Sequence, residues 1–263
     1  MSDAVSGSGA IRVTTAEGVA ELRLHGTDNR NALSSAMWEA LRSFAKSVAE
    51  DRAVRVILLA GDDTVFSSGA NITEFPALRA PGATRAYDDL VESALRALEA
   101  VPQPTLACIA GPCVGAGASL ACGCDIRIAA DDAYFMVPAA RLGLGYDPRG
   151  IARFVRVFGD STARGLLLGG LRCDARAAHS LGAVHRLVGP GTVLEEGRRV
   201  ARDMAGHAPL TVAAAKAALS VLATPDAGGE AVRRLALEAD ASADYAEGLS
   251  AFVEKRKPGF RGR

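Results

Sequence analysis

Two glycine-rich loops in this chain could bind a negatively charged oxygen through their backbone. FSSGAN occupies residues 66–71, and GPCVGAGASLACGCD follows at residues 111–125. Small side chains let a ligand approach the backbone closely, and a helix that begins near Ala116 would leave its first N–H groups unpaired. One N–H from each loop could then donate to a single developing oxyanion. Ordinary tight turns that pack a helix against a strand are the alternative, and glycine spacing alone favours them.

Other chemistries that use glycine-rich loops fit these residues less well. Residues 115–120 lack the third glycine of a dinucleotide fingerprint, and the chain holds no GKS or GKT phosphate loop. Residues 117–121, GASLA, differ at one position from the GxSxG motif of serine hydrolases. That motif places its serine on a sharp strand-to-helix turn, whereas several loop residues precede Ser119 here. A serine hydrolase acting through Ser119 is therefore kept as a minor alternative.

The composition indicates a globular protein with a sizeable core. The 263 residues are 49% hydrophobic and 23% charged. Thirty basic and thirty acidic residues cancel, so we expect neither nucleic acid nor a membrane surface as a partner. No secretory signal is visible at the N-terminus, and prolines and glycines break the uncharged residues 101–124, so we expect a cytoplasmic protein without a membrane span. Five cysteines without ligand spacing predict small core fillers and no metal site.

Strand and helix patterns alternate along the first 205 residues or so, which indicates an α/β fold. Residues 11–15 and 19–24 predict a hairpin, and Ser34 is the expected N-cap of a helix that continues to about residue 51. Each glycine loop follows an apolar strand pattern, at residues 54–61 and 105–111. Further expected elements are a loop at residues 76–84, a helix at 87–100, a strand at 126–137, a helix–turn–helix at 152–170 and mostly helix from 208 onward.

Four stretches of the chain resemble the enoyl-CoA hydratase/isomerase (crotonase) superfamily. They are FSSGANITEF, GPCVGAGASLACGCDIRIA, MVPAARLGLG and AFVEKRKPGF, and the similarity runs from about residue 10 to 260. The resemblance implies a flexible N-terminus at residues 1–9, a spiral core of ββα units at 10–205, and a helical trimerisation region at 206–263. It also implies a homotrimer or dimer of trimers, a place in fatty acid metabolism and an acyl-CoA thioester as ligand. Coenzyme A would enter as part of the substrate, with no separate cofactor.

The resemblance also assigns site residues. Ala70 and Ala116 match the two residues whose backbone N–H groups form the family's oxyanion hole. Phe252 and Lys255 match residues that reach coenzyme A from a neighbouring subunit. The remaining positions implied to contact the substrate or coenzyme A are Arg30, Ser68, Asn71, Ile72, Val114, Gly117 and Tyr146.

The acid–base residues are where this chain departs from the hydratases it resembles. Those enzymes carry two glutamates where this chain has Ser119 and Ala139. A well-placed acid or base contributes about 10²–10⁴ in rate, and neither a serine without a partner nor an alanine replaces one. We therefore expect isomerase- or hydrolase-like chemistry rather than efficient hydration. A homolog that binds acyl-CoA without turnover is the alternative.

One carboxylate near the glycine loops could still move a proton. Asp147 resembles the position at which dienoyl-CoA isomerases and chlorobenzoyl-CoA dehalogenases carry a functional aspartate, which makes it the candidate acid or base. The alternative is a purely structural role, because an aspartate before Pro148 is a typical N-cap for a helix that begins near Arg149. The two roles exclude each other only in part.

Overall fold

The computed structural model describes residues 9–26, 30–80, 82–222 and 229–263. The flexible N-terminus predicted for residues 1–9 lies, apart from Gly9, outside the described residues. Along the described ranges, every helix is too short or too polar to cross a membrane.

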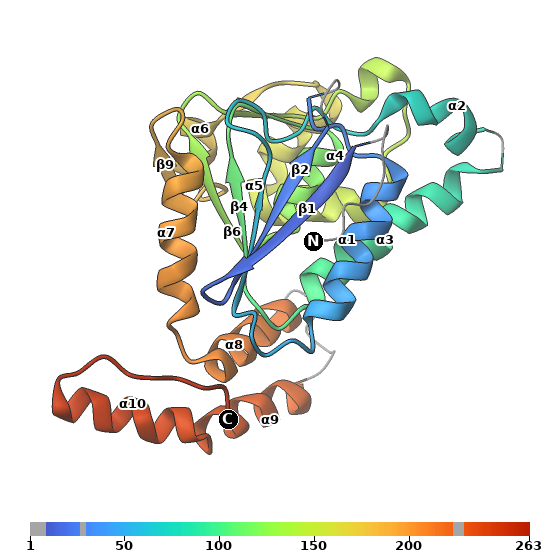
Figure 1. Cartoon of the computed structure of the whole chain (residues 1–263). Helices are drawn as coiled ribbons and strands as arrows, with labels where there is room; N and C mark the ends of the chain where they lie inside the picture. Colours follow the sequence, from blue (N-terminus) through green and yellow to red (C-terminus); the bar gives the residue numbers. More distant parts are fainter. Residues whose placement is uncertain (1–8, 27–29, 81, 223–228) are drawn as a thin grey trace.

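A six-stranded sheet forms the centre of the molecule (Figure 1). Its hairpin, β1 (Ala10–Ala16) and β2 (Val19–His25), is antiparallel as the sequence predicts. The other strands run parallel, in the order β1-β2-β3-β4-β6-β9. Both faces of the inner strands are buried, which explains their continuous apolar sequence. The bounds are β3 (Val56–Ala60), β4 (Thr105–Ile109), β6 (Ile126–Ala130) and β9 (Arg186–Val188).

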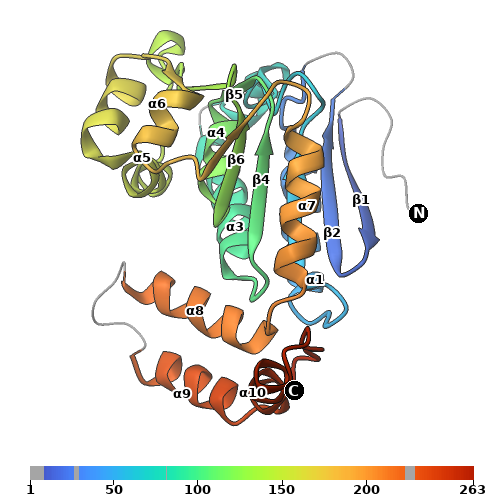
Figure 2. The ribbon, with the colours of Figure 1, turned by 90° about the vertical axis from the view of Figure 1, so that its left-hand side faces the viewer.

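Helices cover both faces of this sheet, and alternate side chains of β3 show how. Ile57 and Leu59 belong to one apolar cluster, together with residues of α1 (Ser35–Val48) and α3 (Thr84–Ala100). Val56, Leu58 and Ala60 belong to a second cluster, with α7 (Val193–Ala205). This alternation is the period of two expected of a strand. Figure 2 shows α7 on one face of the sheet, with α1 and α3 behind it.

Several helix predictions are confirmed. Ser34 is the N-cap of α1, and its hydroxyl accepts a hydrogen bond from the Met37 N–H at 3.2 Å. The helix expected after the second glycine loop is α4 (Ala116–Cys122). The helix–turn–helix corresponds to α5 (Pro148–Leu168), which is interrupted where Gly159 has a φ of 73°.

Other elements differ from the prediction. The strand expected at residues 126–137 is wrong as one unit, because a turn after β6 moves the chain into a second sheet. The loop expected at residues 76–84 contains part of a short helix, since proline fits the first turn of α2. Apart from β7, which lies within the strand expected at residues 126–137, the segments of two to six residues given next were not predicted, because they are too short for a periodic pattern. The second sheet and the short elements are β5 (Pro112–Val114), β7 (Tyr134–Met136), β8 (Cys173–Asp174), η1 (Ile72–Glu74), α2 (Phe75–Leu78), η2 (Ala139–Leu142) and α6 (Ala175–Ser180).

The C-terminal region is helical, as predicted. It consists of α8 (Pro209–Leu222), α9 (Gly229–Asp240) and α10 (Ala243–Glu254). These helices lie together at the end of the molecule away from α2 and α4 (Figures 1 and 2). The cysteines are free and buried, and burial raises the pKa of Cys122 and of Cys124 to about 12, so both are packed as neutral thiols.

Candidate active site

The two glycine-rich loops lie side by side at the carboxyl ends of β3 and β4. Ser67 and Cys113 form a parallel bridge between them. The Val114 N–H donates to the Ser67 carbonyl at 2.9 Å, and the Phe66 N–H donates to the Pro112 carbonyl at 3.1 Å. Since β3 and β4 are adjacent parallel strands, their carboxyl ends bring the loops together, and the bridge fixes their register.

Two glycines allow this close contact. A Cβ atom on Gly69, whose φ is 116°, would lie 3.3 Å from the Val114 carbonyl oxygen and 3.9 Å from the Ala116 nitrogen. A Cβ atom on Gly117 would lie 2.5 Å from the Cβ of Ser67, well inside van der Waals contact. The packing of one loop on the other therefore requires these small residues. This is the alternative of tight turns and close packing that the sequence also predicts.

The backbone N–H of Ala70 points away from the adjacent segment of the same chain, at Leu33. The Leu33 N–H donates to the Gly69 carbonyl at 2.7 Å, and the Asn71 N–H donates to the Leu33 carbonyl at 2.8 Å. In a trans peptide the N–H of one residue is directed opposite to the carbonyl of the residue before it. The Ala70 N–H is thus directed away from Leu33, and it has no acceptor within the described parts of the chain.

The backbone N–H of Ala116 is free for a different reason. Ala116 is the first residue of α4, and the first helical bond runs from the Ser119 N–H to the Gly115 carbonyl at 3.0 Å. The Gly115 N–H is occupied by the Met136 carbonyl at 2.8 Å. Across the residues that the structure describes, nothing accepts a hydrogen bond from the Ala116 N–H.

Both alanines line one cavity of about 140 Å³. Its walls come from the two loops, from η1, α2 and α3, and from the segment between β7 and α5. Apolar side chains dominate the lining, including Val91, Leu95, Val137 and Leu144. The residues predicted from the sequence that line it are Ser68, Ala70, Ile72, Val114, Ala116, Ser119, Ala139, Tyr146 and Asp147.

Five predicted residues do not line this cavity. Arg30 is exposed, Asn71 caps η1 by accepting from the Thr73 N–H at 3.3 Å, and Gly117 packs against Ser67. Phe252 lies on α10 and Lys255 follows it, at the far end of the molecule (Figure 1). Phe252 is 84% exposed, so the described part of its own chain covers little of it.

A hydroxyl pair lies at Ser119, in the lining of the cavity. Ser119 Oγ and Tyr146 Oη are 2.6 Å apart, and the tyrosine ring packs edge-on against Phe154. Burial raises the pKa of Tyr146 to about 12. The tyrosine is therefore protonated and a poor base near neutral pH, and either hydroxyl can be the donor of this bond. Ala139 lines the cavity as well, and its side chain provides no titratable atom.

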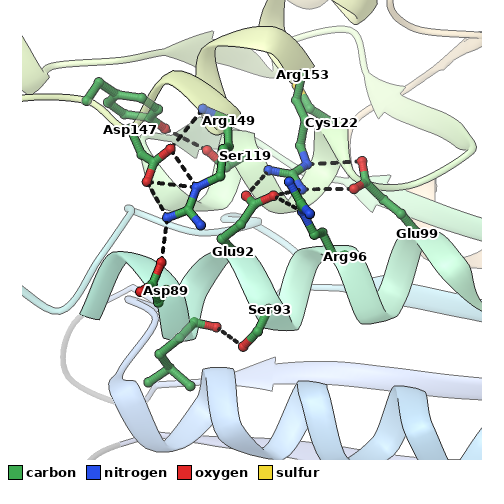
Figure 3. Close-up of polar contacts among 12 residues, drawn as sticks. Asp89, Glu92, Ser93, Arg96, Glu99, Ser119, Cys122, Asp147, Arg149 and Arg153 are labelled. Carbon is green, nitrogen blue, oxygen red and sulfur yellow. Dashed lines mark hydrogen bonds and ion pairs between the residues drawn. The ribbon is translucent and has the colours of Figure 1, made fainter. Parts of the chain in front are cut away.

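Asp147 is the N-cap of α5, as the structural interpretation predicts. Its Oδ1 accepts from the Arg149 N–H at 2.8 Å, and its Oδ2 accepts from Arg149 Nη2 at 2.6 Å (Figure 3). The hydrogen bonds from the Arg149 side chain lower the pKa of Asp147. Arg149 also donates to Asp89 at 2.9 Å. Asp147 is also one of the residues that line the cavity, so it both caps the helix and belongs to the site.

Sequence analysis missed a second carboxylate in this cavity, Asp88 on α3. It accepts a hydrogen bond from Arg79 at 2.9 Å. Burial raises its pKa, and the negative charge of Asp147 adds to that shift against the opposing charge of Arg79. Of the two aspartates that line the cavity, Asp147 thus has a lowered pKa and Asp88 a raised pKa.

A buried ion pair closes another part of the cavity wall. Glu92 and Arg153 are 6% and 4% exposed, and Arg153 Nη1 donates to Glu92 Oε2 at 2.6 Å (Figure 3). Burial opposes ionisation of Glu92, but the hydrogen bonds from Arg153 and Arg96 outweigh it and lower its pKa. The charges of Glu92 and Arg153 bind each other through these hydrogen bonds. The pair therefore shapes the wall and is a poor proton carrier. The only sign of these carboxylates in the sequence is that Asp88 and Glu92 are four residues apart, which places them on one face of a helix. A solvent-exposed helix face shows the same spacing, so the spacing does not indicate a site.

We expect a Gly117→Ala variant to be destabilised, because its new methyl group would overlap Ser67. Overpacking costs about 1–3 kcal/mol, and the better helix propensity of alanine offsets at most about 1 kcal/mol. Urea denaturation measures the net loss. Gly145→Ala is the matched control, since a Cβ there meets nothing within 4 Å. Equal stability of the two variants would contradict the tight contact between the loops.

Known sequences and structures are similar to most of this chain. Residues 14–263 match the sequence profile of the family described as enoyl-CoA hydratase/isomerase. A probable enoyl-CoA hydratase of Mycobacterium leprae is 34% identical, over 96% of this chain and 99% of its own. The 1,2-epoxyphenylacetyl-CoA isomerase of Escherichia coli is 32% identical, over 94% and 96%. The crystal structure of an enoyl-CoA hydratase/carnithine racemase from Magnetospirillum magneticum superposes with a TM-score of 0.92 at 35% identity, covering 96% of each chain.

Proposed function

Since the chain belongs to the enoyl-CoA hydratase/isomerase (crotonase) family of acyl-CoA enzymes, we propose that it transforms an acyl-CoA thioester through an enolate. The thioester oxygen would accept hydrogen bonds from the backbone N–H groups of Ala70 and Ala116. Two N–H groups on adjacent loops support this proposal, because neither has a partner among the described residues and both alanines line one cavity. Such donors stabilise the negative charge that develops on the oxygen when a proton leaves the neighbouring carbon.

We assign the proton transfer to the two aspartates of the cavity. Asp147 has the lower pKa and is ionised near neutral pH, so it would take the proton as the C–H bond breaks and the electron pair moves onto the thioester oxygen. Asp88 has the higher pKa and is the better proton carrier of the two. Return of the proton to a different carbon completes an isomerisation, with no group added or lost. This chemistry requires no cofactor beyond the coenzyme A of the substrate.

Isomerase- or hydrolase-type chemistry fits this cavity better than efficient hydration. Addition of water requires one group that deprotonates the water and another that protonates the carbon. Where hydratases carry their glutamates, this chain offers the hydroxyl of Ser119, already bonded to Tyr146, and the methyl group of Ala139. Neither can serve as an acid or base at neutral pH.

Hydrogen–deuterium exchange tests the proposal without requiring that the net reaction be known. We expect the protein in D₂O to introduce deuterium next to the thioester carbonyl of saturated, enoyl or dienoyl-CoA esters, detected by mass spectrometry. A panel of such esters would also identify the net reaction. If CoA esters bind while none of them exchanges or reacts, the chain is a non-catalytic acyl-CoA-binding homolog and the proposal is wrong.

A Ser119→Ala variant should keep its rate within about tenfold of the wild type. Among the residues that the structure describes, the Ser119 hydroxyl bonds to Tyr146, whose raised pKa of about 12 makes it a poor base for activating a serine. Exchange kinetics give the rate, and a fluorophosphonate probe should leave Ser119 unlabelled. Tyr146→Phe is the matched control for loss of the same hydrogen bond. Labelling of Ser119, with complete loss of turnover in Ser119→Ala, would favour the serine hydrolase instead.

We also propose that the C-terminal helices assemble the protein as a trimer or a dimer of trimers. In such an assembly Phe252 and Lys255 would contact coenzyme A bound to the neighbouring subunit. Both lie far from the cavity of their own chain, and an exposed phenylalanine is costly to leave in water. Exposed apolar side chains in this region include Leu237, Tyr245, Leu249, Phe252 and Val253. Sedimentation of the full chain measures the assembly.

A further inference from the structure

The wall of the candidate active site at α2 and α3 carries an arginine that the proposed chemistry does not use. Arg79 follows α2 and lines the cavity. Its Cζ atom lies 5.0 Å from the ring centre of Phe75 and 5.3 Å from that of Tyr87. Its Nη2 donates to Asp88 at 2.9 Å. A cation over aromatic rings is stabilised by their electron density, so two rings and a carboxylate hold this guanidinium group in place.

These contacts use only part of the guanidinium group. Nη2 bonds to Asp88, and Nε is enclosed by protein without a partner. Nη1 has no partner among the described residues either, but it is not enclosed, and the Arg79 side chain keeps 17% of its surface exposed. Arg153, the other arginine in the described lining, bonds through all three nitrogens to Glu92 and Glu99. Arg79 Nη1 is therefore the unused cationic donor in this wall.

An unused donor in a largely apolar cavity bears on the acyl group that binds there. A hydrocarbon chain packed against Arg79 would remove water from Nη1 and supply no acceptor in its place, which weakens binding. An acyl group with an oxygen at this point would accept a hydrogen bond from Nη1 and replace the water. The wall therefore favours an oxygenated acyl group over a plain alkyl chain.

The charges of the lining indicate which kind of oxygen fits. Asp88, Glu92 and Asp147 outnumber Arg79 and Arg153 in the described lining. Asp88 also already pairs with Arg79, so a carboxylate of the substrate would lie close to a like charge and be repelled. A neutral oxygen accepts the same hydrogen bond without that repulsion.

We propose that Arg79 is a specificity-determining residue, and that the substrates are acyl-CoA esters whose acyl group carries a ketone or hydroxyl oxygen that accepts a hydrogen bond from Arg79 Nη1. This inference rests on the proposed function, because the thioester must lie at Ala70 and Ala116 for its acyl group to reach this wall. Since Phe75 and Tyr87 hold the guanidinium group before the ester arrives, little side-chain freedom is lost on binding.

Calorimetric titration of the full chain with a series of esters tests the proposal. Hexanoyl-CoA is the reference, and its oxo derivatives place one ketone at the third, fourth or fifth carbon. We expect at least one oxo ester to bind at least about tenfold more tightly than hexanoyl-CoA. Adipyl-CoA, which ends in a carboxylate, should bind less tightly than that oxo ester. If all oxo esters bind like hexanoyl-CoA, or if adipyl-CoA binds the most tightly, the proposal is wrong.

Deuterium exchange, measured on the same esters against a protein-free control, separates this inference from the proposed function. Exchange without any preference for an oxygen keeps the proposed function and overturns the role of Arg79. A preference for an oxygen without exchange keeps the role of Arg79 and shows a homolog that binds acyl-CoA without turnover. If no CoA ester binds, both are wrong.

An Arg79→Lys variant assigns the preference to this residue. Lysine keeps a positive charge beside Asp88 but lacks the second nitrogen of the fork, so we expect the preference for the oxo ester to fall below about threefold. Arg85→Lys is the matched control: Arg85 is 93% exposed on α3, pairs with Asp89 outside the lining, and should keep the full preference. Thermal melts check both folds, and the esters on the wild-type chain still decide the proposal if Arg79→Lys does not fold. An unchanged preference in folded Arg79→Lys would overturn it.

Discussion

An Ala116→Pro variant is expected to lose about 10²–10³ in its exchange or turnover rate, with little change in its affinity for CoA esters. Proline has no backbone N–H, so the substitution removes one of the two proposed donors to the thioester oxygen. Loss of a single oxyanion-hole donor costs about 2.7–4 kcal/mol of transition-state stabilisation. Because the charge on that oxygen develops only as the proton leaves, the loss falls on the rate more than on binding.

The position of Ala116 makes this a clean test. It is the first residue of α4, where proline is tolerated and where no helical hydrogen bond is lost. The preceding residue, Gly115, has a φ of 52° and the backbone freedom of glycine. Ala116→Gly keeps the N–H and should retain the rate within a few-fold. Thermal melts of both variants detect any loss of fold. A wild-type rate in a folded Ala116→Pro variant would remove this N–H from the mechanism.

The parts of the site that could be predicted from the sequence are those set by local backbone requirements. Gly69 and Gly117 are small because two loops touch at those positions, and a glycine-rich stretch after an apolar strand already indicates such a contact. Asp147 before Pro148 is a cap whose hydrogen-bond partner, the Arg149 N–H, lies two residues away. In each case the physical cause lies within a few residues of the signal.

The charged residues of the cavity could not be predicted, because their partners are distant in the sequence. Asp88 and Glu92 have the spacing of a solvent-exposed helix face, and only the packing of α5 against α3 shows that Glu92 is buried against Arg153. The pKa of Asp88 depends on burial and on Asp147, which lies elsewhere in the chain. Short elements such as β8 and α2 were not predicted for a related reason. Tertiary contacts determine them more than sequence periodicity does.

An Asp147→Asn variant is expected to lose about 10²–10⁴ in exchange rate while remaining folded. Asparagine caps a helix about as well as aspartate, and loss of a partly exposed ion pair with Arg149 costs at most about 1 kcal/mol. The variant therefore removes the titratable group and keeps the N-cap, which separates the two roles of Asp147.

The lowered pKa means that ionised Asp147 stabilises the fold above about pH 4 and that this contribution is lost as the pH falls.

Two further variants decide how the proton is carried. Asp88→Asn should also slow exchange, because it removes the carboxylate whose pKa is raised and whose charge interacts with that of Asp147. Asp89→Asn is the matched control: Asp89 is half-exposed, pairs with Arg149 from outside the cavity lining, and its loss should leave the rate unchanged. If Asp88→Asn exchanges like the wild type while Asp147→Asn does not, a single carboxylate takes and returns the proton. If both variants match the Asp89→Asn control, the proton moves through another group and the assignment to aspartates fails.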